Sequence, residues 1–258
     1  MKTKYSIALM MAAVILLALS VPVQASKTDD QIVSSAKNSY VFKNYLKNDD
    51  VKIQSKDGAV TLTGTVSEES HKTLARETVA GLSGVKTVDN RLEVKGAPLA
   101  ATSSDAWLVT KVKTTLLFHS SVSASATEVD VKDGIVTLRG DAANQAQKDL
   151  TTEYAKDIDG VKDVKNEMVV YAPSKKTQPA KKTPAAGGQI DDASITGLAK
   201  MTLLYHRSTS ALNTSVTTKN GVVTLTGKAK NAAEKDLAAK YVKDVNGVKS
   251  VNNQMTIE

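Results

Sequence analysis

The 258-residue chain contains no cysteine, so it can form neither a disulfide nor a cysteine-ligated metal site. Its three histidines form no obvious ligand set, and it lacks both a phosphate-cradling glycine loop and a Gly-x-Ser-x-Gly nucleophile turn. Aromatic residues make up only 4% of the chain, too few to stack bases beside the basic residues. The sequence therefore predicts no catalytic, metal-binding or cofactor-binding residue and no nucleic-acid partner.

The chain also lacks an apolar run long enough to cross a bilayer. The longest run, residues 7–19, has about 13 residues, whereas a spanning helix needs about 20. Two lysines precede it and Val23-Gln24-Ala25 follows it, which is the pattern of a secretory signal peptide. We predict cleavage after Ala25, no lipid anchor because no cysteine can carry one, and a periplasmic mature chain. A retained membrane anchor is the alternative.

One nine-residue segment occurs three times in the chain. Residues 56–64, Lys-Asp-Gly-Ala-Val-Thr-Leu-Thr-Gly, return in slightly altered form at residues 132–140 and 219–227. A second signature, Gly-Val-x-x-Val-x-Asn, follows each copy at the same distance along the chain. Three copies of one unit indicate three small modules in place of one large enzyme core.

The repeats divide the chain into six segments. We predict a signal peptide at 1–25, unit one at 26–96, a linker at 97–104, unit two at 105–172, a Pro/Lys-rich linker at 173–189 and unit three at 190–258. The second linker concentrates basic charge at Lys175, Lys176, Lys181 and Lys182 and is typical of an extended, solvated spacer. Contact of these lysines with an anionic lipid surface is the alternative.

Each unit has the pattern helix, strand, strand, helix, strand. The units open with acidic or hydroxyl residues suited to helix N-caps, and Leu108, Val112 and Leu116 show the apolar spacing of a first helix. The Asp-Gly and Asn-Gly pairs predict hairpin turns between two strands, and Asn231 with Glu234 resembles a capping box for the second helix. We predict an α+β fold with both helices on one face of a three-stranded mixed sheet.

That order of elements, with Asp/Asn-Gly-x-Val-x-Leu-x-Gly before the second helix and Gly-Val-x-x-Val-x-Asn after it, closely resembles the BON domain. The chain is similar to the osmotically inducible periplasmic members of that family, which carry two units instead of three. It is unlike the lipoprotein members, which need an N-terminal cysteine. The resemblance implies a non-enzymatic envelope-stress protein that binds phospholipid surfaces or, like a chaperone, unfolded exported proteins.

The arrangement and partners of the units remain open at this point. A structural adaptor that docks onto one envelope protein or the cell wall, through the sheet edges of the units, is the alternative function. The spacer at 173–189 favours independent motion of unit three, whereas the shorter join between units one and two favours closer contact. The oligomeric state does not follow from the sequence.

Trp107 is the only tryptophan and lies beside Leu108 at the start of the first helix of unit two. The equivalent residues in the other units are Gln31 and Ser194, so the position does not belong to a shared core. An exposed indole ring beside apolar residues is suited to a membrane–water interface, which makes Trp107 and Leu108 candidates for lipid or partner contact. A partly buried packing residue at the helix end is the alternative.

Leu117-Phe118 and Leu204-Tyr205 end the first helices of units two and three, and Val41-Phe42 occupies this place in unit one. Their presence in every unit favours the core, and contact with lipid or a partner protein is the alternative. His119 and His206 follow directly. A basic residue at a helix C-terminus is stabilised by the helix dipole, so we predict that role for both histidines in preference to a metal-binding or pH-sensing role.

We expect Trp107→Ala to weaken binding to anionic vesicles or to an aggregating client protein without loss of folding, because the indole supplies an interfacial contact. Lipid titration monitored by the fluorescence of the single tryptophan measures the wild-type affinity, and cosedimentation compares the variant. Unchanged binding with an intact circular dichroism spectrum would remove Trp107 from the candidates.

Overall fold

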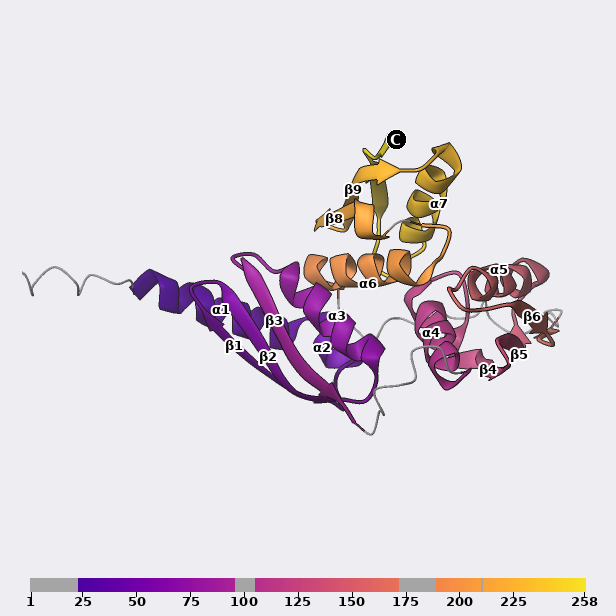
Figure 1. Ribbon diagram of the computed structural model, residues 1–258, viewed down its shortest axis with the longest axis horizontal. Helices are drawn as coiled ribbons and strands as arrows, with labels where there is room; N and C mark the ends of the chain where they lie inside the picture. Colours follow the sequence, from indigo (N-terminus) through magenta and orange to yellow (C-terminus); the bar gives the residue numbers. More distant parts are fainter. Residues whose placement is uncertain (1–22, 96–104, 172–188, 210) are drawn as a thin grey trace, which may run out of the picture.

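The computed structural model describes residues 23–95, 105–171, 189–209 and 211–258. Most of the predicted signal peptide and nearly all of both predicted linkers lie outside these ranges. Within them the chain forms three α+β units in sequence order, as predicted (Figure 1). None of the helices in these ranges is both long and apolar enough to span a membrane.

Unit one contains one helix more than the predicted pattern. Its elements are α1 (Val23–Asn38), α2 (Tyr40–Asn44), β1 (Asp50–Lys56), β2 (Ala59–Val66), α3 (Glu69–Ala80) and β3 (Thr87–Val94). The additional helix α2 begins at Ser39, whose hydroxyl accepts a hydrogen bond from the N–H of Phe42. β2 lies between the other two strands, antiparallel to β1 and parallel to β3.

Units two and three repeat this topology, with their last strand interrupted. Unit two consists of α4 (Asp105–Phe118), the 3₁₀ turn η1 (Ala124–Ala126), β4 (Thr127–Lys132), β5 (Ile135–Ala142), α5 (Gln145–Lys156), β6 (Asp163–Asn166) and β7 (Val169–Val170). Unit three consists of α6 (Asp192–Tyr205), η2 (Ala211–Asn213), β8 (Thr214–Lys219), β9 (Val222–Ala229), α7 (Ala232–Lys243), β10 (Ser250–Asn253) and β11 (Thr256–Ile257). The two short final strands of each unit pair in parallel with the same central strand, β5 or β9.

An aspartate of the first helix binds the hairpin turn of each unit. In unit one the carboxylate of Asp29 accepts hydrogen bonds from the N–H groups of Asp57 at 2.8 Å and Gly58 at 3.0 Å. The same bonds recur from Asp133 and Gly134 to Asp105, and from Asn220 and Gly221 to Asp192. Of the acidic residues expected to be N-caps, these three therefore bind a turn, while Asp191 caps α6 by accepting from the N–H of Ser194.

The asparagine of the second signature fastens the last strand to the second helix. The side-chain amide of Asn166 donates to the carbonyl oxygen of Lys148 at 2.9 Å, and its oxygen accepts from the N–H of Met168 at 2.9 Å. Equivalent bonds link Asn90 to Lys72 and Leu92, and Asn253 to Lys235 and Met255. The signature is thus a structural one, since the same side chain satisfies both a helix carbonyl and a strand amide.

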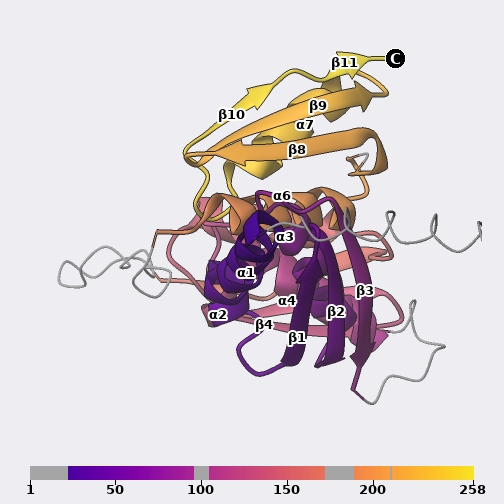
Figure 2. The same ribbon diagram turned by 90° about the vertical axis from the view of Figure 1, so that its left-hand side faces the viewer.

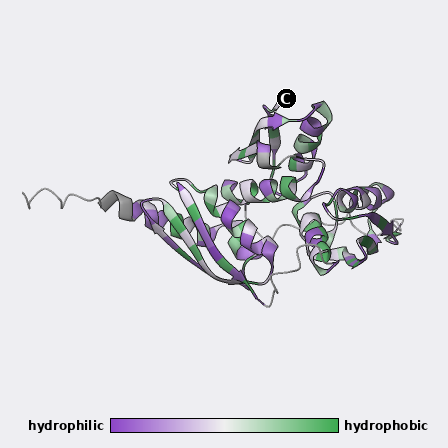
Figure 3. Ribbon diagram, viewed as in Figure 1, coloured by the Kyte–Doolittle hydropathy of each residue, from purple (hydrophilic) through white to green (hydrophobic). Residues whose placement is uncertain are grey.

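Each unit has its own hydrophobic core between the helices and one face of its sheet. Polar and apolar residues alternate along the strands, as Figure 3 shows, so one face of each sheet is buried and the other is polar. The cores are joined where the units meet. Phe118 from unit two and Leu198, Met201 and Tyr205 from unit three pack in the core of unit one, and Tyr241 from unit three packs in that of unit two.

Unit three packs against unit one through α6 and α3. Figure 2 shows α6 between the sheet of unit three and α3, and Lys200 pairs with Glu77 across this contact at 3.0 Å. The N–H of Tyr40 also donates to Asp191 at 2.7 Å, and the N–H of Val41 donates to Ser194 at 3.0 Å. The expectation that the second linker leaves unit three to move independently is therefore wrong for this structure.

Gly197→Ala tests the contact between α3 and α6. A Cβ atom at residue 197 would lie 2.6 Å from Thr78 Oγ1, so we expect a loss of roughly 1–3 kcal/mol of unfolding free energy from overpacking. Thermal and denaturant unfolding measure the change. In an exposed helix the same substitution raises the free energy of unfolding by about 1 kcal/mol. The sign of the measured change therefore shows whether α3 and α6 are in contact.

Thr78→Ala provides the matched control. It removes the hydroxyl that a Cβ atom at residue 197 would meet, so the double variant should recover part of the lost stability. Stabilisation by Gly197→Ala alone would contradict the packing of unit three on unit one.

Candidate functional site

Of the six residues predicted for lipid or partner contact, the structure buries three, exposes two and leaves Trp107 half-buried. Leu108, Phe118 and Tyr205 are buried, with exposed fractions of 5%, 0% and 4%. Leu117 and Leu204 are 46% and 44% exposed, because adjacent residues on a helix point in different directions. The first helices of units two and three therefore each end in one core residue and one apolar surface residue.

Trp107 is half-buried at the junction of units two and three. Its ring packs edge-to-face on Tyr205, with 6.4 Å between ring centroids. The ammonium group of Lys111 lies 5.8 Å from the centroids of both rings, within cation–π range. This is the arrangement of a packing residue at the helix end, and burial raises the pKa of the Tyr205 hydroxyl beside it.

A shallow hollow lies beside Leu204, where α6 and β8 meet α3. Its volume is about 240 Å³, and it is lined by Arg76, Glu77, Lys200, Met201, Leu203, Leu204, Ala211, Thr214 and Val216. The lining combines apolar side chains with two cationic ones. Glu77 lies 2.5 Å from Arg76 and 3.0 Å from Lys200, so one carboxylate holds both cations at this surface. An apolar hollow bordered by cations is suited to an anionic amphiphile.

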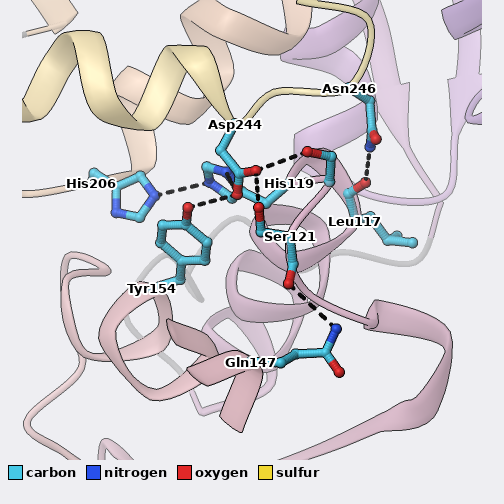
Figure 4. Close-up of polar contacts among 9 residues, drawn as sticks. Leu117, His119, Ser121, Gln147, Tyr154, His206, Asp244 and Asn246 are labelled. Carbon is cyan, nitrogen blue, oxygen red and sulfur yellow. Dashed lines mark hydrogen bonds and ion pairs between the residues drawn. The ribbon is translucent and has the colours of Figure 1, made fainter. Parts of the chain in front are cut away.

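A second cluster, which the sequence did not reveal as a site, joins the ends of four helices at the junction of units two and three (Figure 4). His119 follows α4 and His206 follows α6, and the two rings are only 2% and 1% exposed. Their Nε2 atoms face each other at 3.4 Å. On the far side of each ring, Nδ1 faces an aspartate of the other unit, at 3.4 Å for Asp244 and 3.2 Å for Asp157.

The two aspartates receive further hydrogen bonds from both units. Asp244 accepts from the hydroxyls of Ser120 at 2.8 Å, Ser121 at 2.5 Å and Tyr154 at 2.6 Å. Burial by itself raises the pKa of Asp244, but the nearby His119 ring, which has the largest opposing effect, and the hydroxyl hydrogen bonds outweigh burial and leave the pKa below its ordinary value. The pKa of Asp157 is lowered in the same way, with His206 and Ser208 as the main partners against burial.

The cluster has approximate twofold symmetry, because units two and three contribute the same positions of the repeat. The ring of Tyr154 stacks on His119 with 3.9 Å between centroids, and Tyr241 stacks on His206 with 4.1 Å. The backbone repeats the symmetry, with the N–H of Ser120 donating to the carbonyl of Asp244 and that of Arg207 to the carbonyl of Asp157. Unit one has Lys43, Thr78 and Gly81 at the equivalent positions of histidine, tyrosine and aspartate, and therefore cannot form this pair.

Neither histidine cluster has the geometry of a hydrolase. In unit one, His71 Nδ1 lies 2.5 Å from Asp49 and 3.1 Å from Ser67 Oγ, so the acid and the hydroxyl meet the same ring nitrogen. A Ser-His-Asp relay needs them on opposite nitrogens. In the ranges that the structure describes, no group of three or more His, Asp or Glu side chains is placed to hold a metal ion.

Comparison with known proteins gives one family and several relatives. A family model described as "BON domain" matches residues 28–96, 104–172 and 191–258. The osmotically-inducible protein Y of Escherichia coli is 30% identical over 54% of this chain and 71% of its own length. The outer membrane lipoprotein DolP of Haemophilus influenzae and a 21 kDa hemolysin of Actinobacillus pleuropneumoniae are 34% and 31% identical, each over 42% of this chain. These last two alignments cover just over half of each relative, 56%.

Tyr154→Phe tests the link between units two and three. It removes the hydroxyl that donates to Asp244 and keeps the ring that stacks on His119, so we expect a loss of about 1.5–3 kcal/mol of unfolding free energy. Chemical denaturation measures it. Tyr171→Phe is the control, since Tyr171 is 64% exposed and its variant should unfold like the wild type. Equal stability of both variants would show that the hydrogen bond contributes nothing.

Proposed function

The chain belongs to the BON-domain family, and from this membership we propose that it is a non-enzymatic envelope protein that binds amphiphilic surfaces under osmotic stress. Its ligands are phospholipid surfaces or unfolded exported proteins. One relative is named for osmotic induction and another as an outer membrane lipoprotein, which supports a place in the cell envelope. With the predicted signal peptide at residues 1–25, that place is the periplasm.

The hollow beside Leu204 is the observation that carries this proposal. Its apolar lining supplies a contact for an acyl chain or an apolar peptide side chain, and Arg76 and Lys200 supply positive charge at the same surface. Its volume of about 240 Å³ is below the roughly 300–1,000 Å³ of pockets that enclose a small molecule. The ligand is therefore touched at a surface and not enclosed, which agrees with binding to a membrane or a chain segment.

The presence of three units in one chain strengthens this binding. Since α6 packs on α3, Leu204 of unit three and Arg76 of unit one belong to one surface. Leu117 lies at the equivalent position of unit two and is also exposed. Several weak apolar contacts held on one body bind an extended surface more tightly than each does alone. This mechanism needs neither a cofactor nor an energy source.

An adaptor function is the second candidate, and the last strand of unit two favours it. Among the described residues, β7 pairs only with β5, and Val169 in this strand and Tyr171 directly after it are 55% and 64% exposed. An apolar sheet edge of this kind can accept a strand of a partner protein. Crosslinking in cells separates the two candidates, because an adaptor gives one dominant protein product and a general binder gives diffuse products.

Leu204→Glu tests the hollow directly. Burial of a leucine side chain contributes about 1.5–3 kcal/mol, so the variant should bind anionic phospholipid vesicles at least tenfold more weakly. Cosedimentation with anionic vesicles measures lipid binding, and suppression of light scattering by an aggregating client measures protein binding.

Leu117→Glu is the matched control, with the same charge change at an equally exposed leucine outside the hollow. Because Leu117 adds at most one further apolar contact outside the hollow, we expect this variant to lose much less binding than Leu204→Glu. Equal losses in both variants would exclude the hollow as the main contact. A wild-type protein that neither sediments with vesicles nor suppresses aggregation would reject the proposed function.

A further inference from the structure

The two buried histidines at the junction of units two and three cannot have all their ring nitrogens protonated at once without repulsion. His119 and His206 together have four ring nitrogens. The carboxylates of Asp244 and Asp157 favour a proton on each Nδ1, because each Nδ1 lies within ion-pairing distance of one of them. The two Nε2 atoms, 3.4 Å apart, are then the nitrogens that can take up further protons.

One proton between the Nε2 atoms forms an N–H···N hydrogen bond and leaves the pair with a single positive charge. A second proton there points two N–H groups at each other and places two buried cations side by side, which is strongly unfavourable at this distance. The geometry therefore has room for one proton between the two Nε2 atoms and opposes a second. Separation of the two rings removes this unfavourable free energy, since water then solvates both cations.

We infer that this junction, formed by His119, His206, Asp157 and Asp244, is an acid-sensitive joint that holds units two and three together at neutral pH and opens as the pH falls. The groups that face the histidines come from every element around them. They are Tyr154 and Asp157 from α5 and its end, Tyr241 and Asp244 from α7 and its end, and Ser120, Ser121, Arg207 and Ser208 from the segments after α4 and α6.

The protonation of these groups supports the direction of the change. Burial lowers the pKa of His119, and the neighbouring His206 acts in the same direction, against the opposing effect of Asp244. Between the lowered pKa and the ordinary histidine value of about 6.5, the open state binds more protons than the closed one. The closed joint is thus most stable above about pH 6.5 and weakens as the pH falls through that window.

The aspartates do not contribute in the same window. The pKa values of Asp157 and Asp244 are both lowered, so these carboxylates stay ionised well below the range in which histidine titrates. Their stabilising effect is lost only at more acidic pH, as the pH falls through their lowered pKa values. With one proton linked to opening, the ratio of closed to open protein should fall by about tenfold per pH unit in the histidine window.

Trp107 reports on the joint because its ring packs on Tyr205 across the same pair of units. In the full-length chain we expect the tryptophan emission to shift to longer wavelength between pH 7.5 and 5.0, with an unchanged far-ultraviolet circular dichroism spectrum. Hydrogen exchange, corrected for the intrinsic effect of pH, should rise at the N–H groups of Ser120 and Arg207, which bond across the junction. The N–H of Lys86, which bonds to Gly58 within unit one, should stay protected.

His206→Gln removes one of the two imidazole rings, so the pair can no longer carry two positive charges, and the pH-dependent shift of the tryptophan emission should disappear. His119→Gln makes the same test if the first variant fails to fold. His71→Gln is the matched control, since this third histidine lies in unit one beside Asp49 and its variant should shift like the wild type. A wild-type protein with no shift and no added exchange at Ser120 overturns the inference. So does an equal shift in a folded His206→Gln variant, or a loss of helical signal at the same pH, which would indicate global unfolding.

Discussion

The burial of α6 on two faces holds the described part of the molecule together. One face of the helix, with Ile195 and Leu203, packs in the core of unit three, while Leu198 and Met201 on another face pack in the core of unit one. A helix with apolar residues on two faces must bury both of them. Gly197 completes the contact, because a residue without a side chain lets the backbone of α3 approach. Without this contact the hollow beside Leu204 would lack the residues of α3 that line it.

A few substitutions in the repeat decide which units pair. Units two and three both carry the histidine, tyrosine and aspartate that form the joint, and unit one carries Lys43, Thr78 and Gly81 in their place. Each buried polar group of the joint has its counterpart in the other unit. Such a network is favourable only when its members meet, so it fixes the orientation of the two units as well as their contact. Unit one docks by a different and mainly apolar route.

The two candidate surfaces differ in how they relate to the solvent. The hollow beside Leu204 is open and combines apolar contact with cations, whereas the histidines of the joint are closed off from solvent. Opening of the joint would bring into contact with water the rings of Tyr154 and Tyr241, which stack on the two histidines and are themselves apolar surface. An acid-opened joint therefore enlarges the adhesive surface of a protein whose proposed function is to bind amphiphilic partners.

The sequence alone determined the repeat, the order of elements and the turns, because these depend on neighbours in the chain. The turn residues adopt the left-handed conformation, with φ of 54° at Asp57, and the N–H of Glu234 is capped by Asn231. The tertiary structure decided the contacts between residues that lie far apart in the sequence. The carboxylate of Asp29 binds a turn 28 residues later in the same unit, and two helix-end histidines of different units meet. The spacing of apolar residues predicts neither contact, since both arise only when separate elements pack.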